Sequence, residues 1–126
     1  SIGLIMGLDT YAVYSSKHPN YTQDGDNSIP DTLFPDNNLC GGMFSGMGAS
    51  FRGKRYNDYV EWATGVSLYD RLIDSEVVQD MYISLKNANF KKYPGDNWNI
   101  SKKETEQLTE WFRVVAQENG SISGWW

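Results

Sequence analysis

The order of apolar and polar side chains predicts one β-strand over residues 5–14. Successive strand residues point to opposite sides of a sheet. One side of this strand therefore collects Leu8, Thr10, Ala12 and Tyr14. The other side collects Asp9, Tyr11 and Val13. Because both sides include apolar residues, we expect the strand to lie inside a sheet rather than at its edge.

Residues 15–50 show no sustained periodicity. Prolines and several Asp and Asn residues interrupt this segment, and glycines dominate residues 41–48 near its end. Short strands within residues 29–34 or 49–51 are the exceptions that we expect. An irregular segment of this length is unusual inside a compact domain, and it is typical of a functional loop, a lid, or a segment covered by another chain.

Helical spacing, with apolar residues three and four positions apart, begins at residue 56. One side of the first helix collects Tyr56, Tyr59, Val60 and Ala63. Gly65 is its predicted end. The same spacing recurs at Leu68, Tyr69, Leu72 and Ile73. A further helix is predicted from Ser75, with Glu76 in its first turn, and its buried side comprises Val77, Val78, Met81, Leu85 and Ala88.

The last helix has the clearest start signal. Ser101 and Glu104 form a capping box, in which the serine oxygen accepts one backbone N–H and the glutamate accepts another. The apolar side of this helix comprises Leu108, Trp111, Phe112 and Val115. Gly120 is predicted to end the helix, and residues 121–126 are left outside any element.

These elements predict a single α+β domain over residues 1–126. We expect a small antiparallel sheet, in which the N-terminal strand pairs with one or two short strands from residues 29–51. Three or four C-terminal helices would pack against this sheet and form the hydrophobic scaffold. Residues 15–50 would then lie over that scaffold or against a neighbouring molecule.

Composition narrows the classes of partner. The chain has 126 residues, with 11 Lys and Arg against 16 Asp and Glu, for a net charge of −5. Aromatic residues make up 14% of it, which argues against disorder, and no apolar run approaches the roughly 20 residues of a membrane span. The acidic balance argues against nucleic acid, because phosphate binding needs a basic stripe. Short basic groups at residues 52–55, 91–92 and 102–103 are interpreted as solvated surface.

The cysteine content favours a reducing, cytoplasmic location. Cys40 is the only cysteine, so no disulfide can form within the chain. Residues 1–6 lack the basic and apolar regions of a signal peptide, which agrees with that location.

The segment Gly48–Arg55 matches the G-x-x-x-x-G-K pattern of a phosphate-binding loop. The match is incomplete, because Arg55 stands where the Ser or Thr ligand of magnesium belongs and no hydrophobic strand precedes the segment. Consecutive backbone N–H groups beside basic side chains can still hold an anion. The candidate ligand-binding residues are Gly46, Gly48, Ser50, Arg52 and Lys54. A purely structural glycine loop is the alternative.

The chain offers few side chains that could act as metal ligands or as catalytic nucleophiles. His18 and Cys40 are the only residues of their types, so a zinc site of N and S ligands cannot form within one chain, and we expect no metal and no cofactor. A Cys40–His18 hydrolase remains open, against the alternative that Cys40 is a small buried hydrophobe. A loose calcium site remains open against the alternative of turn-forming acids. Its candidate ligands are Asp24, Asp26, Asp31 and Asp36.

The chain contains five tryptophans and eight tyrosines, and these aromatic residues are the remaining indication of a binding surface. Tyr59, Trp62 and Trp111 lie on or near helix sides that are predicted to face inward. Three other rings lie outside the predicted elements: Trp98, Trp125 and Trp126. Aromatic residues are enriched where proteins meet, so these rings indicate a partner chain or a second subunit. A sugar or another flat ligand stacking on the rings is the alternative.

Four short motifs occur together in this chain: Met6–Tyr11, Leu39–Met43, Ser50–Lys54 and Thr64–Tyr69. In these motifs the chain resembles small uncharacterised bacterial and phage proteins that open with M-G-L-D-x-Y. The resemblance implies a bacterial, phage or environmental source, and it implies that Met6 is an alternative start. It implies no activity and no catalytic residue. Residues 18–38 depart from the group as an insertion peculiar to this chain.

The sequence thus indicates a non-enzymatic protein that acts through protein–protein contacts, as a homo-oligomer or with another partner. This hypothesis depends on the aromatic residues outside the predicted elements and on the long irregular segment. The alternative is a protein, including an enzyme, that binds a small molecule or an anion with the Gly-rich loop over residues 40–55. Neither hypothesis involves nucleic acid or a membrane.

Overall fold

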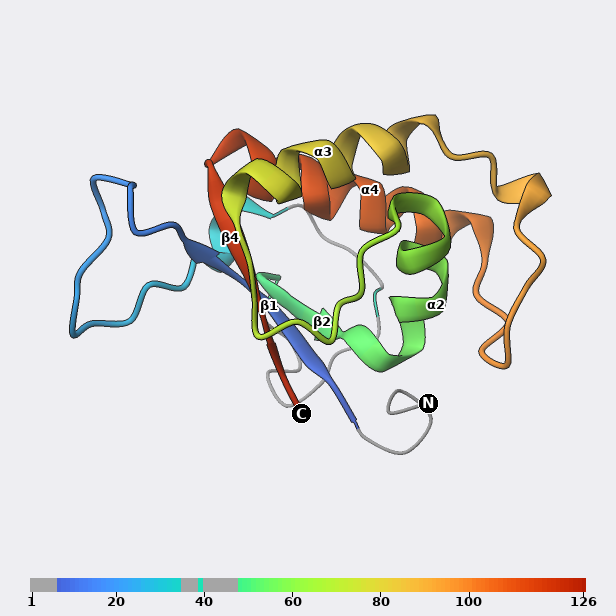
Figure 1. Cartoon of the computed structure of the whole chain (residues 1–126), viewed down its shortest axis with the longest axis horizontal. Helices are drawn as coiled ribbons and strands as arrows, with labels where there is room; N and C mark the ends of the chain where they lie inside the picture. Colours follow the sequence, from blue (N-terminus) through green and yellow to red (C-terminus); the bar gives the residue numbers. More distant parts are fainter. Residues whose placement is uncertain (1–6, 35–38, 40–47) are drawn as a thin grey trace.

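The computed structural model describes residues 7–34, 39 and 48–126, which form a four-stranded antiparallel sheet with three α-helices on one of its faces (Figure 1). The strands are β1 (Asp9–Tyr14), β2 (Ser50–Arg52), β3 (Leu72–Ile73) and β4 (Gly120–Trp125). The helices are α2 (Gly53–Thr64), α3 (Ser75–Asn87) and α4 (Lys102–Gln117), with 3-10 turns η1 (Asp31–Leu33) and η2 (Phe90–Lys92). The predicted α+β class is confirmed.

The first and last strands pair in the middle of the sheet. The strand order is β2-β1-β4-β3, and each residue of β1 pairs with one of β4, from Asp9 opposite Trp125 to Tyr14 opposite Gly120. The predicted interior position of β1 is therefore confirmed. Its predicted start at residue 5 falls partly outside the described residues, which place the start of β1 at Asp9.

The prediction that residues 121–126 lie outside any element is wrong. Helix α4 ends at Gln117, Asn119 reverses the chain with a φ of 50°, and Gly120 begins β4 instead of ending the helix. Glycine and serine have low strand propensity, so the local sequence signal for β4 is weak. The strand forms because β1 and β3 supply backbone hydrogen bonds on both of its sides.

The front part of the chain contributes two of the four strands. Strand β2 confirms the short strand predicted within residues 49–51, and it pairs with β1. Within residues 29–34 the structure has η1 rather than a strand, although the Ile29 N–H donates to the Ala12 carbonyl at 3.1 Å. The expectation that residues 15–50 lie over the helical scaffold is wrong for Ile29, Phe34 and Ala49, which are buried in the core.

The helix predicted from the spacing of residues 68–73 is absent. A turn precedes β3, which pairs with Ile122 and Ser123 in the middle of β4. The Leu68 N–H donates to the Asn57 side-chain oxygen at 2.7 Å, and the Tyr69 N–H donates to Ser67 Oγ at 3.1 Å. Such side-chain acceptors hold backbone N–H groups outside a helix, which explains how buried residues with helical spacing adopt a loop.

Helices α3 and α4 follow their predicted patterns closely. The capping box of Ser101 and Glu104 is present, and the predicted apolar side of α4 is buried. In α3 the buried residues are Val78, Met81 and Leu85, whereas Val77 is exposed. Asp74 is the N-cap of α3, so the predicted cap residue, Ser75, is its first helical residue instead.

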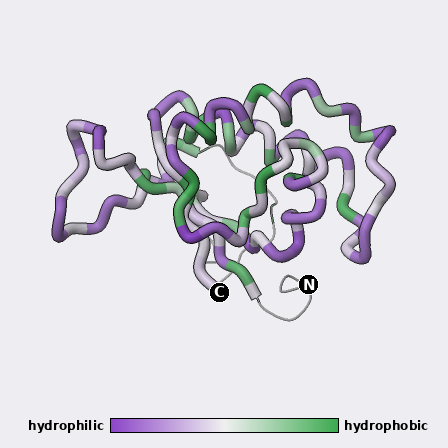
Figure 2. Tube along the Cα trace, viewed as in Figure 1, coloured by the Kyte–Doolittle hydropathy of each residue, from purple (hydrophilic) through white to green (hydrophobic). Residues whose placement is uncertain are grey.

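Trp111 on α4 is the centre of the core between the sheet and the helices, where apolar segments gather (Figure 2). Its ring stacks on Phe34 and meets the edge of Phe51, and its Nε1 donates to the Gly48 carbonyl at 3.0 Å. Trp111 and Tyr59 are buried as predicted. Trp62 is not, because 40% of its side chain is exposed.

An ionic cluster ties the start of α2 to the start of α4. Arg55 donates to both carboxylate oxygens of Glu104, at 3.0 and 3.3 Å, and the Tyr56 hydroxyl donates at 2.8 Å. Burial opposes the charged form of Glu104, but the hydrogen bonds from Arg55, the Ser101 N–H and Tyr56 outweigh it and lower its pKa to about 2. The carboxylate is therefore charged at every ordinary pH.

We predict that Glu104→Gln lowers the free energy of unfolding at pH 7 by about 2 kcal/mol, because the pKa of Glu104 is lower in the folded protein than in the unfolded chain. This stabilisation is present above the ordinary glutamate pKa near 4.5 and is lost as the pH falls toward 2. Urea unfolding at several pH values measures it. An unchanged difference between the two proteins from pH 7 to pH 2 would contradict the assignment.

We also predict that Thr10→Val raises the free energy of unfolding by about 1 kcal/mol, because the Thr10 hydroxyl is buried without a hydrogen-bond partner among the described residues. Thr105→Val is the matched control. Thr105 is also buried, but its hydroxyl donates to the Lys102 carbonyl at 2.6 Å, so its loss should destabilise the protein. Effects of the same sign in both variants, measured by thermal and urea unfolding, would refute this explanation.

Candidate functional site: a groove on the open face of the sheet

The face of the sheet opposite the helices is set by the register between β1 and β4. Tyr11 lies opposite Ser123, and Val13 lies opposite Ser121. All four side chains therefore share the open face, together with Trp125 two residues beyond Ser123. The prediction of which β1 residues share each face is confirmed, since Thr10 and Ala12 are both buried on the helix side.

The open face presents large apolar side chains around a floor of small ones. Trp125 is 59% exposed and Leu72 of the edge strand β3 is 58% exposed. Between them lies the hydroxyl-bearing floor, in which Ser121 is almost fully buried. Large exposed rings beside a buried polar floor are typical of a surface that binds something.

A groove of about 520 Å³ lies between this face, the loop over residues 15–28 and the start of α3. Tyr11, Val13 and Trp125 line it from the sheet, and Tyr21 lines it from the loop. Leu72 completes the apolar lining at the edge strand. The groove therefore combines side chains from three regions that are distant in the sequence.

Close packing of the chain end positions Trp125. A side chain at Gly124 would lie 2.7 Å from the Leu68 carbonyl and 2.8 Å from that of Asp70, so only glycine allows this approach. The next residue, Trp126, meets the ring of Tyr69 edge-on and lies under the Arg71 guanidinium, 5.2 Å from its ring centroid. These contacts hold the backbone of β4 while the Trp125 ring stays on the open face.

Three carboxylates, which we call the acid rim, line the groove: Asp26, Asp74 and Glu76. A hydrogen bond from Ser28 lowers the pKa of Asp26, and a backbone hydrogen bond followed by the Lys17 ammonium lowers that of Glu76. Lys17 Nζ lies 3.0 Å from Glu76, with both side chains mostly exposed. An ion pair in this setting stabilises little, so it opens at low cost.

The predicted Gly-rich site is dispersed over separate contacts. The Gly48 carbonyl accepts the Trp111 ring N–H, Ser50 is buried in β2, and Arg52 is exposed opposite Asp9. Gly46 and most of the loop, residues 40–47, lie outside the described residues. The anion-binding hypothesis stays a prediction.

The backbone of residues 48–55 differs from that of a phosphate-binding loop. Such a loop connects a strand to a helix, whereas here the same residues form β2 itself and α2 starts at Gly53. The Gly53 N–H donates to the Leu8 carbonyl at 2.9 Å. The Lys54 ammonium lies 5.9 Å from the centroid of Trp98, and Arg55 pairs with Glu104. These groups are already engaged within the protein.

The side chains proposed for a Cys–His hydrolase or a calcium site form no cluster in the described part of the chain. His18 stacks on Tyr14 and its Nδ1 accepts the Asn20 N–H at 3.0 Å, while Cys40 lies outside the described residues. Asp31 accepts the Ala49 N–H at 2.7 Å, a hydrogen bond between residues 18 positions apart. Within residues 7–34, 39 and 48–126, no three His, Cys, Asp or Glu side chains lie together as metal ligands.

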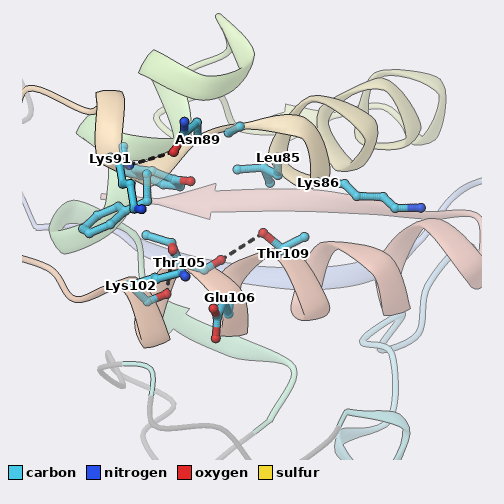
Figure 3. Close-up of a pocket in the computed structure, with 11 residues that line it drawn as sticks. Leu85, Lys86, Asn89, Lys91, Lys102, Thr105, Glu106 and Thr109 are labelled. Carbon is cyan, nitrogen blue, oxygen red and sulfur yellow. Dashed lines mark hydrogen bonds between the residues drawn. The ribbon is translucent and has the colours of Figure 1, made fainter.

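A second cavity, of about 450 Å³, lies where the end of α3, η2 and the start of α4 meet (Figure 3). Lys86, Lys91 and Lys102 surround it, and Glu106 also lines it. The Thr105 and Thr109 hydroxyls beside them donate to backbone carbonyls of α4. This end of the molecule is basic, in contrast to the acid rim of the groove.

No protein-family model, curated protein or solved structure matches the chain. The resemblance to small bacterial and phage proteins therefore stays a prediction, and the groove is judged on its geometry. Across the described residues, no helix is both long and apolar enough to cross a membrane.

The groove was not predicted, although the sequence holds part of its signal. Residues 121–125 alternate between small or aromatic side chains on one face and Ile122 and Gly124 on the other. Combined with the exposed position expected for Trp125, this alternation indicates a strand with one open face. The acid rim has no such signal, because only the fold brings the loop over residues 15–28 and the start of α3 to the same groove.

We predict that Trp125→Ala lowers the free energy of unfolding by less than about 1 kcal/mol, whereas Trp111→Ala lowers it by about 3–5 kcal/mol. The reason is that Trp125 is mostly exposed and Trp111 is buried in the core. Urea unfolding of the two variants provides the measurement. Comparable losses would show that the Trp125 ring supports the fold rather than a binding surface.

Proposed function

We propose that the protein is a non-enzymatic binding domain, whose groove receives a segment of another protein that carries apolar side chains flanked by lysine or arginine. The observation that carries this proposal is the groove itself, with the exposed Trp125 and Leu72 beside the acid rim. The cytoplasmic location expected from the sequence remains part of the proposal.

The shape and lining of the groove support a polypeptide ligand. Buried aromatic anchors dominate binding energies at protein interfaces, and tryptophan is the ring most enriched there. Trp125, Tyr21 and Leu72 offer such contacts around a groove of about 520 Å³. The Ser123 hydroxyl, which donates to the Arg71 carbonyl, can still accept a hydrogen bond from the backbone of an extended segment.

The charge of the acid rim supports the choice of flanking residues. Asp26, Asp74 and Glu76 all line the groove, and Lys17 is the one basic side chain among the described residues that line it. Complementary charge steers association and excludes segments with the wrong sign. An incoming lysine can replace Lys17 beside Glu76, since that exposed pair holds weakly.

Selection from a random heptapeptide library displayed on phage tests the proposal, with the Trp125→Ala protein as the counter-target. We expect enriched peptides to place an aromatic or aliphatic residue next to Lys or Arg, and Trp125→Ala to weaken their binding at least about tenfold, or ~1.4 kcal/mol. Fluorescence titration with the enriched peptides measures the affinity.

A matched pair of variants controls for nonspecific apolar binding. Leu72 in the groove and Ile83 on α3 are similarly exposed, at 58% and 55%. Leu72→Ala should weaken binding of the enriched peptides, and Ile83→Ala should leave it unchanged. Equal effects of the two, enrichment of acidic peptides, or no enrichment over the counter-target would each contradict the proposal.

A further inference from the structure

Charge is distributed very unevenly along this acidic chain. Residues 86–103 contain five lysines against a single acid, Asp96, so this segment carries +4. Because the whole chain carries −5, the remaining residues carry −9. We call the five lysines the lysine end: Lys86, Lys91, Lys92, Lys102 and Lys103. They are exposed, and none has an ion pair among the described residues.

The loop over residues 15–28, which carries Asp26, and the segment that follows α3 lie at opposite ends of the longest axis of the molecule (Figure 1). Helix α3 runs between them, with Asp74 and Glu76 at its start and Lys86 in its last turn. At about 1.5 Å per residue, Glu76 and Lys86 are roughly 15 Å apart along this helix. That exceeds the screening length of about 8 Å at physiological salt, so the two ends do not neutralise each other.

The lysine end is held in place by packed rings rather than by a loose loop. The ring of Tyr93 lies 5.1 Å from that of Tyr59 and 5.2 Å from that of Trp62, by ring centroids, and Phe90 also contacts this cluster. The segment that follows α3 therefore projects as a fixed tip beyond the helices (Figure 1). Three lysines of the lysine end line the cavity in Figure 3: Lys86, Lys91 and Lys102.

We propose that the groove of one copy of this chain receives the lysine end of a second copy, so that the protein self-associates head to tail. This inference rests on the proposed function of the groove and names its partner. The lysine end has the charge that the acid rim requires, and the partly exposed Trp62 beside it offers an apolar contact to Trp125 and Tyr21.

Head-to-tail contact has a consequence that a symmetric dimer lacks. The two contacting surfaces differ, so each copy keeps one unused surface of each kind after the first contact, and the assembly grows. The groove lies beside the loop over residues 15–28, on the opposite side of the molecule from the segment that follows α3, so growth continues as a chain of copies (Figure 1). Its size therefore rises with protein concentration and falls with salt, since charge holds it together.

Sedimentation velocity of the full chain tests this in about 20 mM and about 500 mM NaCl. At low salt we expect the average mass to rise continuously past that of a dimer as the protein concentration increases. At high salt we expect the monomer. A protein that stays monomeric at low salt, or that stops at a dimer, overturns head-to-tail association.

Two neutralised variants sharpen the test. The first removes charge from the lysine end: Lys86→Gln, Lys91→Gln and Lys102→Gln. The second removes charge from the acid rim: Asp26→Asn, Asp74→Asn and Glu76→Gln. All six side chains are exposed, so the fold should persist. We expect each variant alone to associate at least about tenfold more weakly than the wild type.

The decisive experiment mixes the two variants. Each retains one intact surface, so an equimolar mixture should form 1:1 heterodimers that cannot grow further. A mixture that behaves as the sum of its parts overturns the proposal. So does an acid-rim variant that associates no more weakly than a control with three other exposed carboxylates neutralised: Asp58→Asn, Glu61→Gln and Asp70→Asn.

Failure of self-association leaves a distinct result for the groove. If the groove still enriches lysine-flanked apolar peptides while the wild-type chain stays monomeric, the proposed function stands and the partner is another protein. If neither occurs, both proposals fall.

Discussion

Pairing between β1 and β4 joins the first described strand to the last, and the fold and the groove both depend on its register. With Ala12 opposite Ile122, apolar side chains meet the helices. The same register leaves Ser121, Ser123 and Trp125 on the open face. A shift of β4 by one residue would exchange these faces, placing the Trp125 ring toward the core and Ile122 toward solvent. The buried helix side therefore determines what the groove presents.

The two ends of the molecule are built by different physical means. At the lysine end, aromatic rings from α2 and from the segment after α3 pack together, and the Arg55–Glu104 cluster ties α2 to α4. At the acid rim, the carboxylates come from the loop over residues 15–28 and from the start of α3. Helix α3 keeps these ends apart, so a modest net charge conceals a strongly dipolar surface.

Local signals were sufficient wherever short-range physics decides the structure. The capping box at Ser101, the αL conformation of Gly65 and the apolar side of α4 each depend on residues within a few positions of one another. Residues 68–73 show where the same reasoning fails. Their spacing fits a helix, but Asn57, eleven residues away, holds the Leu68 N–H in a loop.

The sequence by itself determined the helices α2, α3 and α4, the two faces of β1 and the acidic balance of the chain, because these follow from propensity, periodicity and composition. Only the tertiary structure decided that residues 120–125 form a strand and that Asp26 and Asp74 line the same groove. It also decided that the loop over residues 15–28 and the segment after α3 lie at opposite ends of the molecule (Figure 1). These features depend on contacts between residues distant in the chain, and no local pattern encodes a contact whose energy exists only after both partners are brought together.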